Sequence, residues 1–294
     1  MRSRTIDWIE PMLKSLIAAV SLVGAVLAGT VSAWSQAQST SADGTPLRIG
    51  IAPHTSARVI IEQYQPVRLA VEKAMAQPAE IVTAPDFTAF ARRALDQEYD
   101  IAVTTGHQAQ LLRQDAGYKP LLTYKADFKA VVVAAIGSAY TDAASLRGTT
   151  VLGLNPSSLV TLWGQHWLKD SKVDAQVRYV SAADSVAQIV LAGDAAAGFM
   201  SLANLQKLAP DVQAKLKVIA ESQPMAGRVY LVNARLADRW PALHDALMAF
   251  AETAEGKTYF DTNALGGYRD IGGEELAAME PLADEVRQVL KAAK

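Results

Sequence analysis

Residues 47–83, LRIGIAPHTSARVIIEQYQPVRLAVEKAMAQPAEIVT, set a pattern that the rest of the chain repeats. The apolar run Leu47–Ala52, which Pro53 ends, is typical of a β-strand. Between residues 57 and 75 apolar side chains recur at helical spacing, and Glu80–Thr83 again has a strand pattern. The segment therefore predicts a strand, a helix and a second strand, which is the right-handed βαβ unit of a parallel sheet.

The same alternation continues toward the carboxyl end. Its further predicted elements are helices from Asp86, after Gly106, at 157–169, 183–192, 240–254 and 274–292, and strands at 100–104, 130–136, 151–154, 177–180, 197–200, 217–220 and 229–232. The strand at 130–136 is apolar on both faces and separates two βαβ sets. We therefore expect two similar α/β lobes with mainly parallel sheets, and ligands at the carboxyl ends of the strands.

The amino terminus has the features of an export signal. Arg2 and Arg4 precede an apolar run of about 13 residues, which is short for a bilayer core of about 30 Å. Small residues at Val31-Ser32-Ala33 then suit a signal peptidase. We interpret residues 1–33 as a signal peptide, cleaved after Ala33 or Ala37, and residues 34–46 as a disordered lead. The alternative is an uncleaved anchor; either way the folded part is expected in the periplasm.

Composition excludes several classes of protein. The chain has 294 residues, of which 50% are apolar and 20% charged, so most of it has enough apolar side chains to build a core. A formal net charge of −2 argues against nucleic acid as a partner. The absence of cysteine excludes disulfides and thiolate metal sites, and no GxSxG, HExxH, phosphate-binding loop or GxGxxG motif is found. We therefore predict no enzyme, no cofactor and no metal.

Four short segments resemble a known family. In order and spacing, Leu47–Pro53, Val82–Phe87, Glu98–Ala102 and Leu146–Gly148 resemble the periplasmic phosphate/phosphite/phosphonate-binding proteins of ABC transporters. The resemblance extends from about residue 47 to about residue 256, and the chain resembles a divergent member of this family.

The resemblance implies a type II solute-binding fold, in which two α/β lobes are joined by a hinge of two crossing strands. By this analogy lobe 1 covers residues 47–133 and is completed by 223–294, while lobe 2 covers 134–222. The implied function is to capture a small oxyanion in the cleft between the lobes and pass it to a permease of the inner membrane. The alternative is a ligand sensor of the same fold that partners a membrane histidine kinase. In both cases the protein is expected to be a monomer.

The strongest candidate for the binding site is the segment Asn155–Thr161, which follows a predicted strand and opens a helix. It stands where the family has the loop Asp-Pro-x-Ser-Thr-Ser-Gly. Aligned on the proline, Ser158 matches the first serine of that loop, whereas the next three positions hold Leu, Val and Thr161. We predict that Ser158 contacts the ligand, together with Ser157 and Thr161; the alternative is that Ser157 only caps the helix.

Two further candidate loops follow strands of the first lobe. His54, Thr55 and Ser56 follow the first strand, and Thr105 and His107 follow the third. Hydroxyl groups and amides at helix starts suit an oxyanion, and a loop histidine can hydrogen-bond one. The two histidines are interpreted as an anion-binding pair or a metal-binding pair. The alternative is that Thr55 and Ser56 are helix caps and the histidines lie on solvated loops.

Ser201 is also predicted to contact the ligand, and it is a departure from the family. Alignment of residues 196–198 on the Asp-Ala-Gly of the family puts Ser201 where aminophosphonate binders tend to keep an acid. Because a buried ammonium group without a partner is costly, the serine argues against an aminophosphonate ligand.

Overall fold

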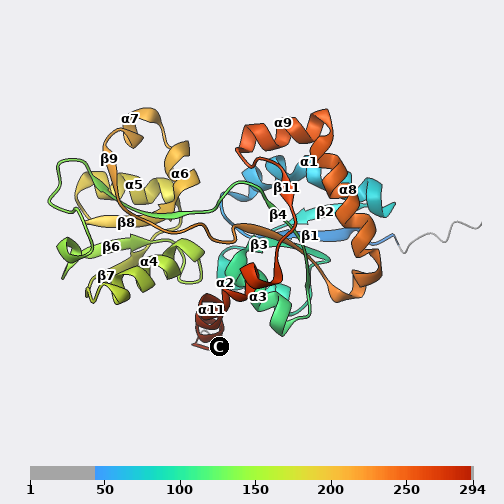
Figure 1. Cartoon of the computed structure of the whole chain (residues 1–294), viewed down its shortest axis with the longest axis horizontal. Coiled ribbons are helices and arrows are strands. Elements are labelled where there is room, and N and C mark those ends of the chain that lie inside the picture. Colours follow the sequence, from blue (N-terminus) through green and yellow to red (C-terminus); the bar gives the residue numbers. More distant parts are fainter. Residues whose placement is uncertain (1–43, 293–294) are drawn as a thin grey trace, which may run out of the picture. The chain divides into compact units, whose positions relative to one another are not determined.

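Two β-sheets organise residues 44–292, which are the residues that the computed structural model describes (Figure 1). The predicted signal peptide and most of the predicted lead lie outside the described residues. Among the described helices, none combines the length and the apolar character needed to cross a membrane.

The first sheet has six strands within the described residues, in the spatial order β11-β4-β10-β3-β1-β2. Strands β1, β2 and β3 are mutually parallel, while β10 and β4 run antiparallel to their neighbours. The bounds are Leu47–Ile51 (β1), Ala79–Val82 (β2), Ile101–Thr105 (β3), Lys119–Tyr124 (β4), Arg228–Val232 (β10) and Tyr268–Arg269 (β11).

The second sheet has five strands within the same described range, in the order β7-β6-β8-β5-β9. Here β6 is parallel to β7 and β8, whereas β5 is antiparallel to β8 and β9. The bounds are Ala130–Ala135 (β5), Thr150–Gly153 (β6), Gln176–Tyr179 (β7), Ala197–Ser201 (β8) and Leu216–Glu221 (β9). The two sheets, each flanked by helices, form a two-lobed mixed α/β architecture, as the sequence predicts.

Both sheets are mixed, although the alternation of strands and helices predicts mainly parallel ones. The chain leaves the first sheet through β4, enters the second through β5, and returns through β9 and β10. The returning strand β10 is inserted between β3 and β4 and runs against both. The antiparallel pairs therefore arise from the two passages between the sheets, which the local sequence pattern does not reveal.

Two short segments, residues 125–129 and 222–227, carry the described chain between the sheets. They touch at an antiparallel bridge between Phe128 and Met225, where the Met225 amide donates to the Phe128 carbonyl at 2.9 Å. Since β5 pairs wholly within the second sheet, the predicted lobe boundary at 133/134 falls inside a strand.

Helices cover both faces of each sheet. On the first sheet, one face carries α1 (Ala57–Met75), α8 (Trp240–Glu252) and α9 (Ala254–Asn263), and the other carries α2 (Phe87–Leu95), α3 (Gly106–Asp115), α10 (Gly273–Ala277) and α11 (Glu280–Ala292). On the second, α4 (Leu159–Asp170) and the 3-10 helix η1 (Ala144–Leu146) face α5 (Ala183–Ala192), α6 (Leu202–Lys207) and α7 (Pro210–Gln213) across the sheet. A second 3-10 helix, η2 (Ala234–Arg239), precedes α8.

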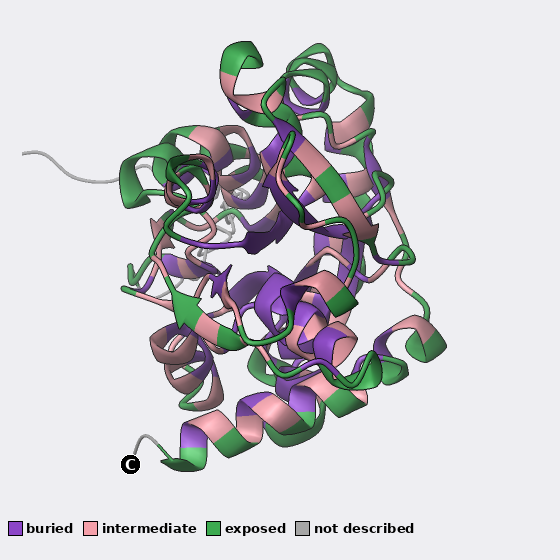
Figure 2. Ribbon diagram, turned by 90° about the vertical axis from the view of Figure 1, so that its left-hand side faces the viewer, coloured by how far each residue is buried: buried purple, intermediate pink, exposed green. Residues whose placement is uncertain are grey.

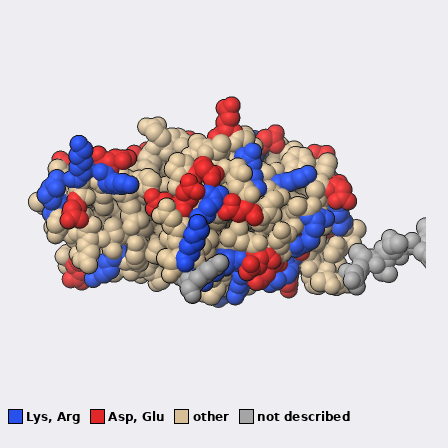
Figure 3. Space-filling model, turned by 90° about the horizontal axis from the view of Figure 1, so that it is seen from below, with Lys and Arg blue, Asp and Glu red and all other residues tan. Residues whose placement is uncertain are grey.

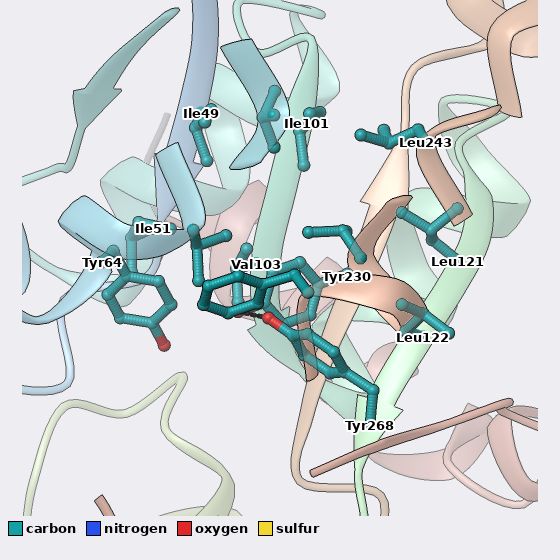
Figure 4. Packing of buried hydrophobic residues seen from close by; sticks show 14 of the residues in the cluster. Ile49, Ile51, Tyr64, Ile101, Val103, Leu121, Leu122, Tyr230, Leu243 and Tyr268 are labelled. Atoms are coloured by element: carbon teal, nitrogen blue, oxygen red, sulfur yellow. Dashed lines mark hydrogen bonds between the residues drawn. The ribbon is translucent and has the colours of Figure 1, made fainter. Parts of the chain in front are cut away.

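A core beneath α1, α8 and α9 contains a group of buried tyrosines (Figure 4). The hydroxyl of Tyr124 lies 2.7 Å from those of Tyr230 and Tyr259, and the hydroxyl of Tyr268 donates to that of Tyr230 at 3.0 Å. Because these buried hydroxyls bond to one another, the core hides them from water without leaving them unpaired.

The carboxyl-terminal helix α11 contacts helices of both sheets. Figure 2 shows it leading to the C label, with buried residues alternating with exposed ones along its length. Its buried side chains pack with Ala91 of α2, Leu111 of α3 and Leu162 of α4. On the same helix, Glu285 Oε1 lies 2.6 Å from His166 Nε2 of α4. Helix α11 is therefore a bridge between the two sheets that is separate from the crossing segments.

Charged side chains on the face shown in Figure 3 are of both signs and are interspersed. On α11, Arg287 pairs with Asp115 of α3 at 2.7 Å and with its own helix neighbours Glu280 and Asp284. The charge of Arg287 is therefore compensated by three neighbouring carboxylates.

Gly164, in the middle of α4, allows that helix to lie directly on the second sheet. A methyl group added there would come within 2.5 Å of the buried ring of Phe199. We expect Gly164→Ala to lower the free energy of unfolding by about 1 to 3 kcal/mol, because overpacking outweighs the better helix propensity of alanine. Urea unfolding followed by circular dichroism measures the change. Gly44→Ala, where the added methyl meets nothing within 4 Å, is the control; equal stabilities of the two variants would contradict the prediction.

Candidate functional site

A cavity of about 350 Å³ lies between the two sheets, at the ends of strands of both sheets that are followed by helices. The first sheet contributes the segments after β1, β2 and β3 and the start of β10, and the second contributes those after β6, β7 and β8. The polar residues that line it are His54, Asp86, Thr105, Asn155, Ser158, Tyr179, Ser181, Ser201, Asn204 and Arg228. This is the edge at which parallel α/β sheets bind ligands.

Four helices of nine or more residues begin at the cavity wall. Their N-cap residues are Asp86 for α2, Thr105 for α3, Ser158 for α4 and Ala182 for α5, and all four line the cavity. The amino end of a helix carries a partial positive charge and amides without helical partners. The cavity therefore receives positive potential from both sheets.

Arg228, the first residue of β10, is the permanently charged cation among the lining residues that the structure describes. Its guanidinium Nη1 donates to the Tyr64 hydroxyl at 3.4 Å, and no carboxylate of the described residues pairs with it. Burial raises the pKa of Tyr124 and Tyr230 well above the usual value, so these nearby hydroxyls stay neutral. The positive charge of Arg228 is thus left without a compensating anion.

The charge of Arg228 contributes to lowered pKa values of two basic groups nearby. The pKa of His54 is lowered to about 3, first by burial and then by Arg228, so its ring is neutral. His54 Nδ1 lies 2.9 Å from the Ala52 carbonyl, which can only accept, so Nδ1 carries the hydrogen. On α6, burial and then Arg228 lower the pKa of Lys207. Both shifts indicate that a further positive charge is disfavoured in this region.

The cavity also has a substantial apolar wall. Phe87 and Leu159 lie at the starts of α2 and α4, and Phe128 comes from the crossing segment 125–129. Asp86 is the carboxylate among the described lining residues, and its Oδ1 accepts the amide hydrogen of Ala89 at 2.8 Å as a helix cap. The site therefore offers positive potential, hydroxyl and amide donors, and apolar surface.

Comparison with known proteins places this arrangement in a family. Residues 49–276 match the family described as "ABC transporter, phosphonate, periplasmic substrate-binding protein". The chain belongs to this family. A search of curated proteins gives no match.

Solved structures share the fold of this phosphonate-family binding protein at low sequence identity. PhnD1 of Prochlorococcus marinus, solved with methylphosphonate, has a TM-score of 0.73 at 12% identity, over 84% of this chain and 100% of that chain. A binding protein component of a phosphonate ABC transporter from Pseudomonas aeruginosa has a TM-score of 0.72 at 16% identity, over 85% and 94%. XAC2383 of Xanthomonas citri, bound to chloride, has a TM-score of 0.71 at 19% identity, over 84% and 99%.

Membership of the family fixes the general role. The binding protein is the periplasmic substrate-binding component of an ABC transporter, which binds a small ligand and works with a permease. The family consists of solute-binding proteins rather than enzymes, and its place is outside the cytoplasm.

Of the nine residues predicted to contact the ligand, the structure puts four at the cavity wall. These are His54, Thr105, Ser158 and Ser201. The other five, Thr55, Ser56, His107, Ser157 and Thr161, are not among the lining residues. Ligand contact by any of the nine stays a prediction. A group of three or more metal-ligating side chains is not found among residues 44–292, and the two histidines thought of as a pair are both engaged with backbone carbonyls.

The predicted anion loop is tied internally. Ser158 Oγ donates to Thr161 Oγ1 at 2.8 Å, and Thr161 Oγ1 accepts the amide hydrogen of Leu154 at 2.8 Å. Thr161 is fully buried because its hydroxyl closes the loop rather than facing the cavity. This loop therefore presents Ser158 and the free amides at the start of α4 to the cavity.

Ser157 and His107 connect the two sheets instead of lining the cavity. The Ser157 hydroxyl lies 2.9 Å from that of Thr88 on α2, and the Ser157 carbonyl accepts from His107 Nε2 at 2.9 Å. Both residues are completely buried. The sequence places them correctly after their strands, but in the structure the His107 ring bonds to the Ser157 carbonyl and the Ser157 hydroxyl contacts Thr88.

Thr55 and Ser56 lie on the exposed side of their loop. The Ser56 hydroxyl accepts the amide hydrogen of Val59 and caps α1, which is the alternative weighed from the sequence.

Arg228 is the functional candidate that the sequence reasoning missed. It opens an otherwise apolar strand, and a charged residue at a strand start ordinarily faces solvent. Its position in the sequence could have indicated a role at the site. It directly follows Gly227, at the predicted return of the chain between the lobes, where the end of a strand meets the cleft.

Proposed function

We propose that this binding protein captures a small oxyanion of the phosphonate, phosphate or phosphite type in the cavity between its sheets. Arg228 is the observation that carries the proposal, because its uncompensated charge faces a cavity where four helix amino ends converge. An anion bound there supplies the missing partner for the guanidinium. Bidentate pairing of guanidinium with phosphonate oxygens is among the strong charge-assisted interactions.

Other observations agree with this assignment. The titles of two similar structures name methylphosphonate and a phosphonate transporter. The wall is divided between segments of two sheets that are joined by short crossing segments, so a ligand that contacts both draws the lobes together. The sequence of residues 1–33 supports export to the periplasm, where the ligand is handed to the permease.

Isothermal titration calorimetry on the purified protein tests the proposal. Methylphosphonate, phosphite and phosphate are titrated in turn, and L-arginine and choline serve as cationic controls. We expect saturable binding of at least one phosphorus oxyanion and none of the cations. If carboxylates or sulfonates bind while every phosphorus oxyanion fails, the proposed ligand class is wrong although the family assignment stands.

A further inference from the structure

We infer that the ligand carries, beside its oxyanion, an uncharged and largely apolar substituent of several carbon atoms. The inference rests on the proposed function and names the ligand class more closely: an alkyl- or arylphosphonate, rather than inorganic phosphate or an aminophosphonate.

The size of the cavity is the first reason. Its volume of about 350 Å³ lies within the range of roughly 300–1,000 Å³ that is typical of small-molecule pockets. A tetrahedral oxyanion has five heavy atoms and fills less than half of this space. The remainder has to be filled by another part of the ligand or by water that gains little from an apolar wall.

The chemistry of the wall is the second reason. Phe87 comes from the first sheet, Leu159 and Val180 from the second, and Phe128 from the crossing segment between them. Gly227 lies directly against Phe128, because a methyl group added at Gly227 would come within 2.8 Å of the Phe128 Cβ. A ligand substituent that contacts these side chains loses apolar surface to the protein from both lobes, which is favourable for an alkyl or aryl group.

The scarcity of carboxylates in the wall is the third reason. Among the described lining residues the acid is Asp86, and the amide of Ala89 already bonds to it. Ser201 Oγ accepts from the Asn204 amide at 3.1 Å and caps α6. An ammonium group on the substituent therefore meets one carboxylate among the described lining residues, that of Asp86 at the amino end of α2, and it shares the cavity with the charge of Arg228. Removing it from water in the same cavity as an unpaired arginine is costly.

The test compares phosphonates that differ only in the substituent. Calorimetry measures the affinities for phosphate, methylphosphonate, propylphosphonate, phenylphosphonate and 2-aminoethylphosphonate. We expect propyl- or phenylphosphonate to bind about tenfold or more tightly than methylphosphonate, phosphate and 2-aminoethylphosphonate, since one or two buried methylenes are worth that much.

Two variants probe the wall separately. Phe128→Ala is expected to weaken phenylphosphonate about tenfold and methylphosphonate much less, while Tyr140→Ala, outside the cavity lining, changes neither. Ser201→Asp keeps a good helix cap and adds an acid to the wall. It is expected to raise the affinity for 2-aminoethylphosphonate relative to propylphosphonate by about tenfold. This second variant remains informative if Phe128→Ala fails to fold.

The outcomes separate the two proposals. If phosphate or methylphosphonate binds as tightly as the larger phosphonates, or 2-aminoethylphosphonate binds most tightly, the inference about the substituent is overturned and the proposed function stands. If no phosphorus oxyanion binds, the proposed function fails and the inference fails with it.

Discussion

Replacing Arg228 by glutamine is expected to weaken phosphonate binding by about 30-fold or more, equivalent to about 2 kcal/mol or more of binding free energy. The guanidinium has no carboxylate partner among the described residues, so a bound anion gains its full charge-assisted interaction. Arg228→Lys keeps the charge but loses the planar fork, and an intermediate loss is expected. Calorimetry with the tightest-binding phosphonate measures these differences.

Stability of the unliganded protein shows whether Arg228 acts on the ligand or on the fold. Removing a partly buried charge that lacks a counter-ion relieves a desolvation cost, so the unliganded variant should unfold at the same or a higher temperature than the parent. Arg58→Gln is the matched control, because the Arg58 side chain is 85% exposed on α1 and should affect neither quantity. A lower melting temperature of Arg228→Gln with unchanged affinity would assign the arginine a structural role and remove the main support for the proposed site.

Acid is expected to destabilise the protein strongly because two histidines are held neutral. Burial lowers the pKa of His107 from 6.5 to about 4, against a smaller raising effect of the bond to the Ser157 carbonyl. That carbonyl only accepts, so Nε2 carries the hydrogen and buried Nδ1 has no partner. Between pH 6.5 and about 4 the His107 imidazole is protonated in the unfolded chain but stays neutral in the folded protein. The free energy of unfolding therefore falls as the pH falls. His107 contributes about 3 kcal/mol to this loss, and His54 adds to it with the same sign.

Chemical unfolding at about pH 7 and about pH 4.5 measures the effect. His107→Gln removes the titrating group while keeping a donor for the Ser157 carbonyl, so its stability should depend less on pH than that of the parent. His244→Gln is the control of opposite sign. Partial burial lowers the pKa of His244, but hydrogen bonds to Asp245 and Asp270 raise it overall, so losing this residue should make acid destabilisation steeper. Identical pH dependence of parent and His107→Gln would show that His107 is not held neutral.

Much of the fold could be predicted because the apolar periodicity is regular. The predicted strands at 47–52, 80–83 and 100–104 coincide closely with β1, β2 and β3. The pattern missed β4, whose sequence KPLLTY has a proline near its start and little alternation, and it also missed helix α9. In neither element is the apolar periodicity clearer than in the flanking segments. Both are stabilised by contacts with residues that are distant in the sequence.

The site was predictable only at the level of loops. Segments that follow parallel strands meet at one edge, and this rule placed His54, Thr105 and Ser158 at the cavity wall, while alignment on the family added Ser201. Which side chain of a loop faces the cavity depends on packing across the two lobes, and in the structure the His107 ring bonds to the Ser157 carbonyl and the Ser157 hydroxyl contacts Thr88. Arg228 could not be found by the same rule, because it opens an antiparallel strand instead of ending a parallel one.

Helix α11 adds a mechanical condition to ligand capture. Any rotation of one sheet against the other has to slide or part the contact in which Leu162 of α4 is buried beside Ala283 and Val286. Uncovering one leucine fully costs about 1.5 to 3 kcal/mol, which corresponds to a factor of about 10 to 150 in an equilibrium constant. If ligand capture involves such a rotation, the binding affinity contains a contribution from a helix that does not line the cavity, and substitutions in the last turns of α11 would change the balance between the two arrangements while leaving the cavity wall the same.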